Sequence, residues 1–126
     1  MGLKTRLAGV VVLAMLGAAL PIGAGAAQTA KQVKITIQHD SSIPDFDGFL
    51  LTSFKCGSGT KVTVYKQKGS SRRPSQDKKI GSDIAQPNGS GYQWFVHTQQ
   101  NKGTFYAHTN AKPGCAAGFS KSITLH

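Results

Sequence analysis

The sequence predicts an all-β fold: a seven-stranded antiparallel Greek-key sandwich with one disulfide, preceded by a signal peptide. Beyond position 26 the chain is rich in Thr, Ser, Gly and aromatic residues and contains no Glu, a composition that favours strands over helices. Short runs of alternating apolar and polar residues recur between turn signals, without a helical period. A chain of 126 residues suits one domain and is too short for an α/β barrel.

The first 26 residues have the order of a secretory signal. Lys4 and Arg6 precede an apolar stretch at 7–20, and small residues lead up to Ala26. We expect cleavage after Ala26 and a secreted domain of residues 27–126 with no transmembrane segment. The alternative is an uncleaved anchor, for which the apolar stretch is short.

Seven runs predict the strands. They cover residues 32–38, 49–55, 61–67, 80–85, 92–98, 104–109 and 119–125. The first run alternates Val33, Ile35 and Ile37 with polar residues, which is the pattern of a half-buried strand. The others follow the same pattern or are apolar on both faces, as at 92–98.

Turn-forming residues separate the runs. Residues 39–48 and 56–59 are predicted as turns, 68–79 as a loop without an apolar residue, and 86–91 as the strongest turn signal. We expect the runs 92–98 and 104–109 to pair as one hairpin, and the sequence does not determine which residues face one another in it. The predicted core consists of Val33, Ile35, Val62, Val64, Ile80, Trp94, Val96, Phe105 and Ile123.

The cysteine count predicts a covalent link across the domain. Cys56 and Cys115 are the only two cysteines. An even number in an exported chain indicates a disulfide. The loop of about 60 residues that it closes makes it worth about 4 kcal/mol in the chain-entropy treatment. We expect the two Cα atoms to lie about 4.4–6.8 Å apart.

A set of turn and packing motifs between about residues 48 and 125 resembles a known family. The motifs are the runs Lys61–Tyr65, Lys79–Asp83, Asn88–Val96, Gly103–Ala107 and Ser120–Ile123, together with the two cysteines. They are similar to small secreted bacterial β-sandwich domains of the carboxypeptidase-regulatory-like, transthyretin-like (prealbumin-like) type. The resemblance implies a non-catalytic accessory or surface module.

Two departures from the family pattern are visible. The residues Ser90-Gly91 are inserted after the Asn-Gly turn. The chain ends in Ile-Thr-Leu-His, whereas the transthyretin-like enzymes that hydrolyse a urate product end in Tyr-Arg-Gly-Ser. That activity is therefore not expected.

Residue types that support catalysis or metal binding occur without an ordered motif. Asp45 and Asp47 faintly resemble the start of a calcium loop, which needs more oxygen ligands and a closing Glu. His97 and His108, on the predicted hairpin, could bind zinc or copper, but a third ligand is not visible. We predict no catalytic residues, no metal site and no cofactor. A small secreted hydrolase or metal-binding protein is the less favoured alternative.

A basic stretch at residues 66–79 is the most distinctive feature. Its cations are Lys66, Lys68, Arg72, Arg73, Lys78 and Lys79, against Asp77 alone. One interpretation is a solvated loop whose lysines discourage edge-to-edge strand pairing. The other is a surface for polyanions such as wall polymers, acidic glycans or lipid headgroups. Specific nucleic-acid recognition is not predicted, since no recognition motif is present.

Together these features predict a secreted, non-catalytic module that binds or scaffolds at the cell envelope. A polyanion-binding module that uses residues 66–79 is the alternative, with cell-envelope polyanions or acidic glycans as partners. The formal net charge of +10 is compatible with both.

Overall fold

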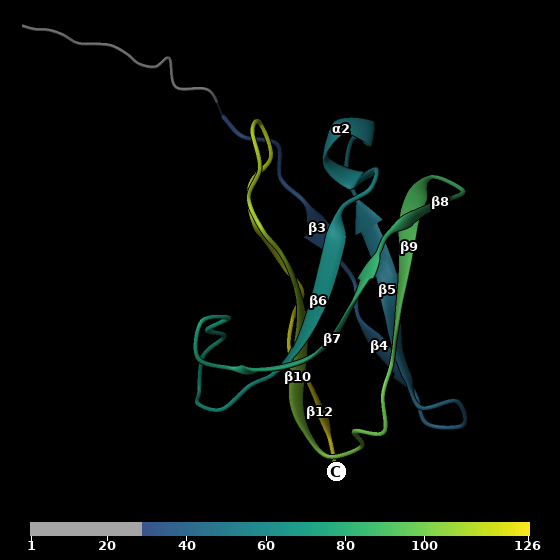
Figure 1. Ribbon diagram of the computed structural model, residues 1–126, viewed down its shortest axis with the longest axis vertical. Coiled ribbons are helices and arrows are strands. Elements are labelled where there is room, and N and C mark those ends of the chain that lie inside the picture. Colours follow the sequence, from purple (N-terminus) through teal and green to yellow (C-terminus); the bar gives the residue numbers. More distant parts are fainter. Residues whose placement is uncertain (1–28) are drawn as a thin grey trace, which may run out of the picture.

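The computed structural model describes residues 29–126, which form two five-stranded antiparallel sheets packed face to face (Figure 1). The all-β prediction is thus confirmed at this level. The predicted signal peptide, residues 1–26, lies outside the described residues. Within residues 29–126 no helix is long and apolar enough to cross a membrane.

The first sheet has the strand order β11-β10-β6-β7, and β12 also pairs with β10. Its strands are β6 (Lys61–Lys66), β7 (Lys78–Ile84), β10 (Gly103–Thr109), β11 (Gly118–Phe119) and β12 (Ile123–Leu125). Both β11 and β12 pair with β10. The predicted strand at 119–125 is therefore one edge strand that is interrupted at residues 120–122.

The second sheet has the strand order β3-β5-β9-β8, and β4 also pairs with β5. Its strands are β3 (Lys34–Ile35), β4 (Gln38–Asp40), β5 (Asp45–Leu51), β8 (Gln86–Asn88) and β9 (Gly91–His97). The predicted strand at 32–38 is likewise interrupted, at residues 36–37.

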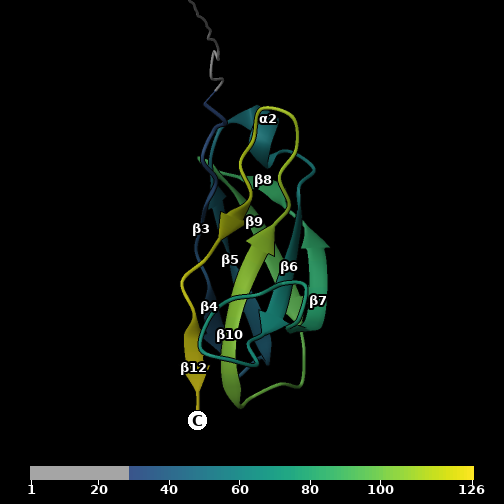
Figure 2. The same ribbon diagram turned by 90° about the vertical axis from the view of Figure 1, so that its left-hand side faces the viewer.

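Both interruptions have the same cause. The Ser120 hydroxyl accepts the backbone N–H of Ala107 at 2.8 Å, in place of a ladder carbonyl. The Thr36 hydroxyl accepts the backbone N–H of Phe49 at 2.8 Å in the same way. These side chains satisfy the neighbouring strand while the edge strand departs from regular pairing. The two edges lie side by side in the sandwich (Figure 2), where β11 contacts β3.

The prediction for residues 39–48 is wrong, because this segment contains strand rather than a long turn. β5 begins at Asp45, and only residues 41–44 form the turn between β4 and β5. Phe46, Gly48 and Leu50 are buried in alternation, and Asp45, Asp47 and Phe49 are partly exposed on the other face. Asp45 and Asp47, two of the acidic residues that suggested a turn, therefore lie on the partly exposed face of a strand. The segment that follows is a short helix, α2 (Phe54–Gly57), instead of a strand end and turn.

The predicted hairpin of 92–98 with 104–109 is also wrong. β9 pairs with β5 in the second sheet, and β10 pairs with β6 in the first. The connection at residues 98–102 crosses between the sheets. Trp94 and Phe105 therefore face the core from opposite sheets, and both are fully buried.

The predicted core is largely confirmed. Seven of its nine residues are buried, and Ile80 and Ile123 are partly buried against the same cluster. Phe46 and Leu50 on β5, which are absent from the predicted core, are also fully buried. The disulfide between Cys56 and Cys115 is present, with a Cα–Cα distance of 5.6 Å, and it fastens α2 to the segment before β11.

Candidate functional site

The β6–β7 connection, residues 67–77, is held in a defined shape by one carboxylate. Asp77 accepts the backbone N–H groups of Lys68 at 2.9 Å and of Arg73 at 2.7 Å. It also accepts the hydroxyl of Tyr106, on β10, at 2.6 Å. The first two bonds close the connection on itself, and the third fastens it to the neighbouring strand. The only acidic residue of the basic stretch thus organises it.

These hydrogen bonds perturb both titrating partners. Partial burial alone would raise the pKa of Asp77, but the bonds from Tyr106 and the two backbone donors outweigh it and hold that pKa below its ordinary value. Burial, followed by the hydrogen bond to the Asp77 carboxylate, raises the pKa of Tyr106 well above its ordinary value. At neutral pH the pair is a phenol that donates to a carboxylate.

The connection covers an aromatic row on the outer face of the first sheet. Tyr65 stacks on Tyr106 with ring centroids 5.5 Å apart, and His108 lies 4.4 Å from Phe119. Tyr106 points away from the core between the sheets, yet it is fully buried. Figure 2 shows the reason, because the connection lies across this face of the sheet.

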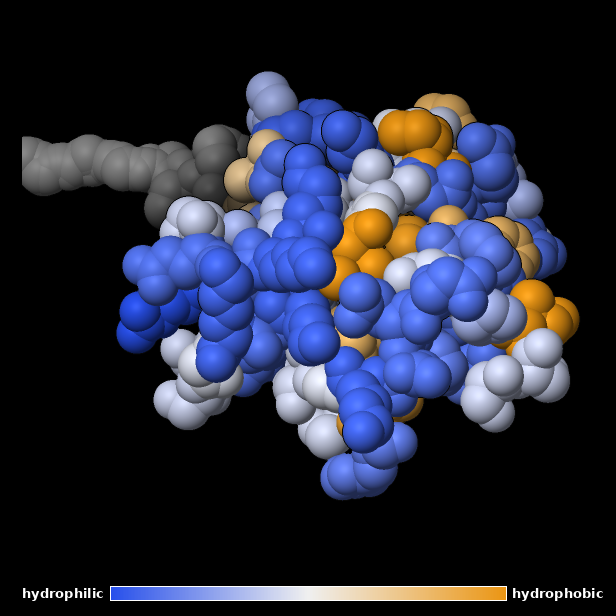
Figure 3. All heavy atoms as spheres, turned by 60° about the horizontal axis from the view of Figure 1, so that its bottom comes forward, coloured by the Kyte–Doolittle hydropathy of each residue, from blue (hydrophilic) through white to orange (hydrophobic). Residues whose placement is uncertain are grey.

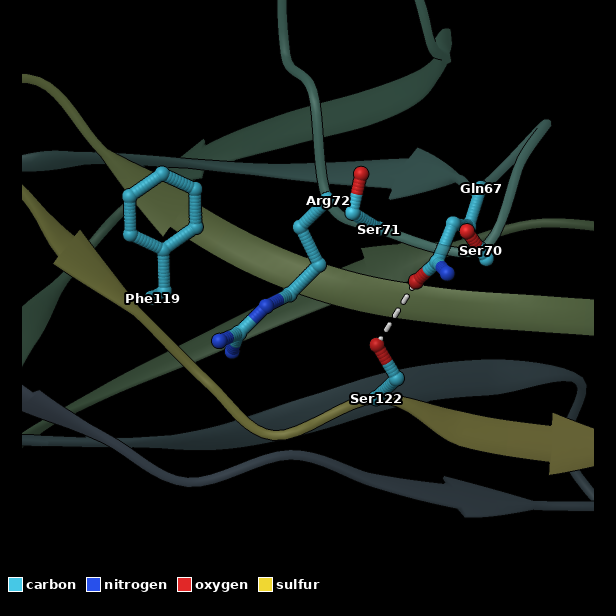
Figure 4. Close-up of a pocket in the computed structure, with 6 residues that line it drawn as sticks. All are labelled: Gln67, Ser70, Ser71, Arg72, Phe119 and Ser122. Atoms are coloured by element: carbon cyan, nitrogen blue, oxygen red, sulfur yellow. Dashed lines mark hydrogen bonds between the residues drawn. The ribbon is translucent and has the colours of Figure 1, made fainter.

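Arg72 is fixed at the interruption of the edge strand. Its guanidinium donates a hydrogen bond to the carbonyl oxygen of Ser120. The same group lies 5.3 Å from the ring centroid of Phe119, an arrangement that adds a cation–π attraction. Figure 4 shows the Arg72 side chain extended from the connection toward the segment that carries Phe119.

The remaining predicted cations lie along the connection and on the two strands, β6 and β7, that it joins. Lys68, Arg73, Lys78 and Lys79 are exposed, and the half-buried Lys66 has its ammonium 5.9 Å from the Phe105 ring centroid. Among residues 29–126 the one ion pair joins His97 to Asp45, so none of the six cations is neutralised in this way. The register of β6 and β7 sets Lys66 opposite Lys78 and Tyr65 opposite Lys79. The predicted residues are thus gathered on one connection and the strand ends that flank it.

Two hollows flank the connection. The first, of about 390 Å³, is lined by Gln67, Ser70, Ser71, Arg72, Phe119 and Ser122 (Figure 4). The second, of about 230 Å³, lies around Lys68, Arg73 and Asp77. Hydroxyl, amide and guanidinium groups dominate the first hollow, a set suited to holding anionic or hydroxylated ligands.

The other candidate residues are not brought together. His97 is exposed and its Nδ1 lies 2.6 Å from Asp45. His108 is buried in the other sheet with Nδ1 2.9 Å from the Gly118 carbonyl oxygen. The prediction that these two histidines share a hairpin is therefore wrong. Asp47 accepts the Gln38 amide at 2.7 Å. Residues 29–126 contain no cluster of three or more potential metal ligands.

Sequence reasoning missed Phe119, Tyr106 and Ser120 as parts of this site. They lie 29 or more positions away from the residues of the connection that they bond, so no local pattern links them. Asp77 could have been singled out, because a lone carboxylate in a basic segment is a natural acceptor for the backbone donors around it.

Neither a comparison with protein-family models nor a search of curated proteins finds a match for the chain.

Proposed function

We propose that the protein is an exported, non-catalytic β-sandwich module that binds polyanions through its basic segment, residues 66–79. The observation that carries this proposal is the arrangement of the cations. The cations lie on a connection that Asp77 and Tyr106 hold in place and on the strand ends that flank it. None of them forms an ion pair within residues 29–126. A preorganised set of cations loses less conformational entropy on binding than a loose loop would.

The mainly hydrophilic surface in Figure 3 is consistent with a charged ligand. In Figure 3, which looks toward the lower end of Figure 1, hydrophilic residues cover most of the surface and leave only separate hydrophobic areas. A surface of this kind suits a charged, hydrated polymer better than an apolar partner.

Two further observations support the export and the type of module. The Cys56–Cys115 disulfide is typical of proteins that fold in an oxidising compartment. The connections β5–β6, β7–β8 and β9–β10 each pass from one sheet to the other, which supports a Greek-key arrangement. These observations support our proposal that the domain is a transthyretin-like or immunoglobulin-like sandwich, similar to carboxypeptidase-regulatory-like modules.

The polar groups of the basic segment suit binding better than proton transfer. A guanidinium stays protonated at physiological pH, so Arg72 and Arg73 are donors only. Asp77 already accepts three hydrogen bonds, and the Ser122 hydroxyl donates to the Gln67 amide oxygen at 2.8 Å. Charge and hydrogen-bond donation are what remain for a ligand.

The test measures the salt dependence of binding to inorganic polyphosphate. The variant Lys68→Gln/Lys78→Gln/Lys79→Gln removes three exposed cations and leaves Arg72, Arg73 and Asp77, which shape the connection, unchanged. The slope of log K against log salt is negative, and each lost phosphate contact makes it shallower by about 0.7 for a flexible chain. The variant should therefore have a slope about two units less negative than that of the wild-type protein.

The matched control removes the same charge elsewhere. Lys31, Lys55 and Lys61 are exposed and lie outside the basic segment, and their replacement by Gln should leave the slope at the wild-type value. Unfolding free energies of both variants should stay within about 0.5 kcal/mol of the parent. Equal slopes for the two variants would refute the proposal and leave the lysines as solvated edge residues.

A further inference from the structure

We propose that the interrupted edge of the sandwich binds an acidic polysaccharide in a groove centred on Phe119. This inference rests on the proposed function and extends it, because it names the class of polyanion and adds residues outside the basic segment.

The groove arises where the two edge strands leave regular pairing. Phe119 lines the hollow of about 390 Å³ that Arg72 and the serines also line. It also lines a larger hollow of about 520 Å³, together with Lys34, Ile35, Thr36, Ile37 and Lys121. Each has a volume typical of small-ligand sites, about 300–1,000 Å³. Since Phe119 is common to both, an extended ligand can contact the two hollows in succession.

The charge of the lining selects an anion. Arg72 stands in the first hollow, and Lys34 and Lys121 stand in the second. The two linings contain no carboxylate. The Arg72 guanidinium has five N–H donors, and its bond to the Ser120 carbonyl uses only part of them. The rest suit a carboxylate, which a guanidinium binds in a fork.

Phe119 favours a sugar over a nucleic-acid base or a lipid chain. The ring is 40% exposed, but His108 lies 4.4 Å away and the Arg72 guanidinium 5.3 Å away. A base that stacks needs a clear ring face, and the two neighbours leave only part of this ring free. Around it Ser70, Ser71 and Ser122 supply hydroxyls that match those of a saccharide. A hydrocarbon chain would make no use of the hydrogen-bonding capacity that these hydroxyls have left.

The experiment compares three ligands by calorimetry: an oligogalacturonate, inorganic polyphosphate, and an uncharged oligosaccharide of the same number of sugars as the oligogalacturonate. The variant Phe119→Leu keeps an apolar side chain and removes the ring. It should weaken oligogalacturonate binding about tenfold and change polyphosphate binding less than about twofold. The control Phe95→Leu alters another exposed aromatic residue, on β9 of the second sheet, and should change neither.

A second pair of variants tests the charges of the larger hollow. Lys34→Gln/Lys121→Gln should weaken oligogalacturonate binding, and Lys31→Gln/Lys61→Gln, with the same loss of charge, should weaken it much less. In the wild-type protein, amide chemical shifts induced by oligogalacturonate should include residues 34–37 and 119–122. The wild-type measurement keeps the test valid if a variant folds poorly.

The outcomes separate the two proposals. Oligogalacturonate shifts confined to residues 66–79, equal effects of the two Phe variants, or equal affinity for the uncharged oligosaccharide would overturn this inference. Polyphosphate binding with the expected salt slope would then still support the proposed function. Failure of the wild-type protein to bind either anionic ligand would overturn both.

Discussion

Replacing Asp77 by Ala is expected to lower the free energy of unfolding by about 2 kcal/mol. The Asp77 carboxylate is the acceptor for Tyr106, a fully buried residue whose hydroxyl would be left without a partner. A hydrogen bond to a charged group contributes about 1.5–3 kcal/mol. The backbone donors of Lys68 and Arg73 are in exposed positions, so water can replace their acceptor and they add little. The midpoint of thermal unfolding should fall by roughly 10 °C.

The effect of this substitution should depend on pH in a defined direction. The pKa of Asp77 is lowered in the folded state, so the carboxylate stabilises the fold above the pKa of the unfolded chain, about 4. That stabilisation is lost as the pH falls through the lower, folded-state pKa. The difference in unfolding free energy between the parent and Asp77→Ala should therefore be constant above about pH 5 and shrink below about pH 4.

The assay is urea unfolding of four proteins: the parent, Asp77→Ala, Tyr106→Phe and the double variant. The cycle isolates the interaction between the two side chains, and we expect a coupling energy of about 1–2 kcal/mol at neutral pH. Asp47→Ala is the matched control, because its carboxylate accepts only an exposed Gln38 amide and the cost should stay below about 0.5 kcal/mol. A coupling energy of zero would refute the proposed interaction between Asp77 and Tyr106. It would also be refuted if the difference in unfolding free energy between the parent and Asp77→Ala stayed the same at pH 3 as at neutral pH.

Three further predictions concern the core and the closure of the domain. Replacing Cys56 and Cys115 by Ser should cost about 4 kcal/mol in equilibrium unfolding, because the disulfide spans 59 positions; a loss below 1 kcal/mol would contradict this. Trp94→Ala should cost about 3–5 kcal/mol in the same assay, since Trp94 is the largest fully buried side chain; near-parental stability would contradict its place in the core. Gly48→Ala should destabilise the fold by more than about 1 kcal/mol in thermal unfolding, because a Cβ there would lie 1.9 Å from the carbonyl oxygen of Thr36. Gly69→Ala is the control and should be neutral in the same assay, because a Cβ there meets open space.

Alternation was the reliable signal for the core. Val62 and Val64 on β6 and Trp94 and Val96 on β9 are buried where the period of two placed them. The same signal was present in Asp45–Leu51, but the acidic residues and the nearby Pro44 outweighed it in the prediction. Charged residues are compatible with a strand when one of its faces is in contact with water. The face of β5 that carries Asp45 and Asp47 is partly exposed.

Strand pairing was beyond local reasoning. The short segment 98–102 was read as a hairpin loop, yet β9 and β10 belong to different sheets. Either arrangement is open to a connection of that length. The choice depends on whether pairing β9 with β5 stabilises the fold more than pairing β9 with β10. The partners in β5 and β9 are 42 to 52 positions apart in sequence, so no local pattern reports on that difference.

Composition, alternation and cysteine count are properties of the linear chain, and they were enough to predict the all-β class, most of the core and the single disulfide. The cations of the basic segment could be located in the same way. Their surroundings depend on contacts that form only in the folded chain. Asp77 meets Tyr106 across 29 positions and Arg72 meets Ser120 across 48, and these contacts convert an apparently loose loop into a fixed one. A hydrogen bond forms between groups that the folded chain brings within about 3 Å, whatever their separation in sequence, so this part of the site exists only once the strands of the first sheet have paired.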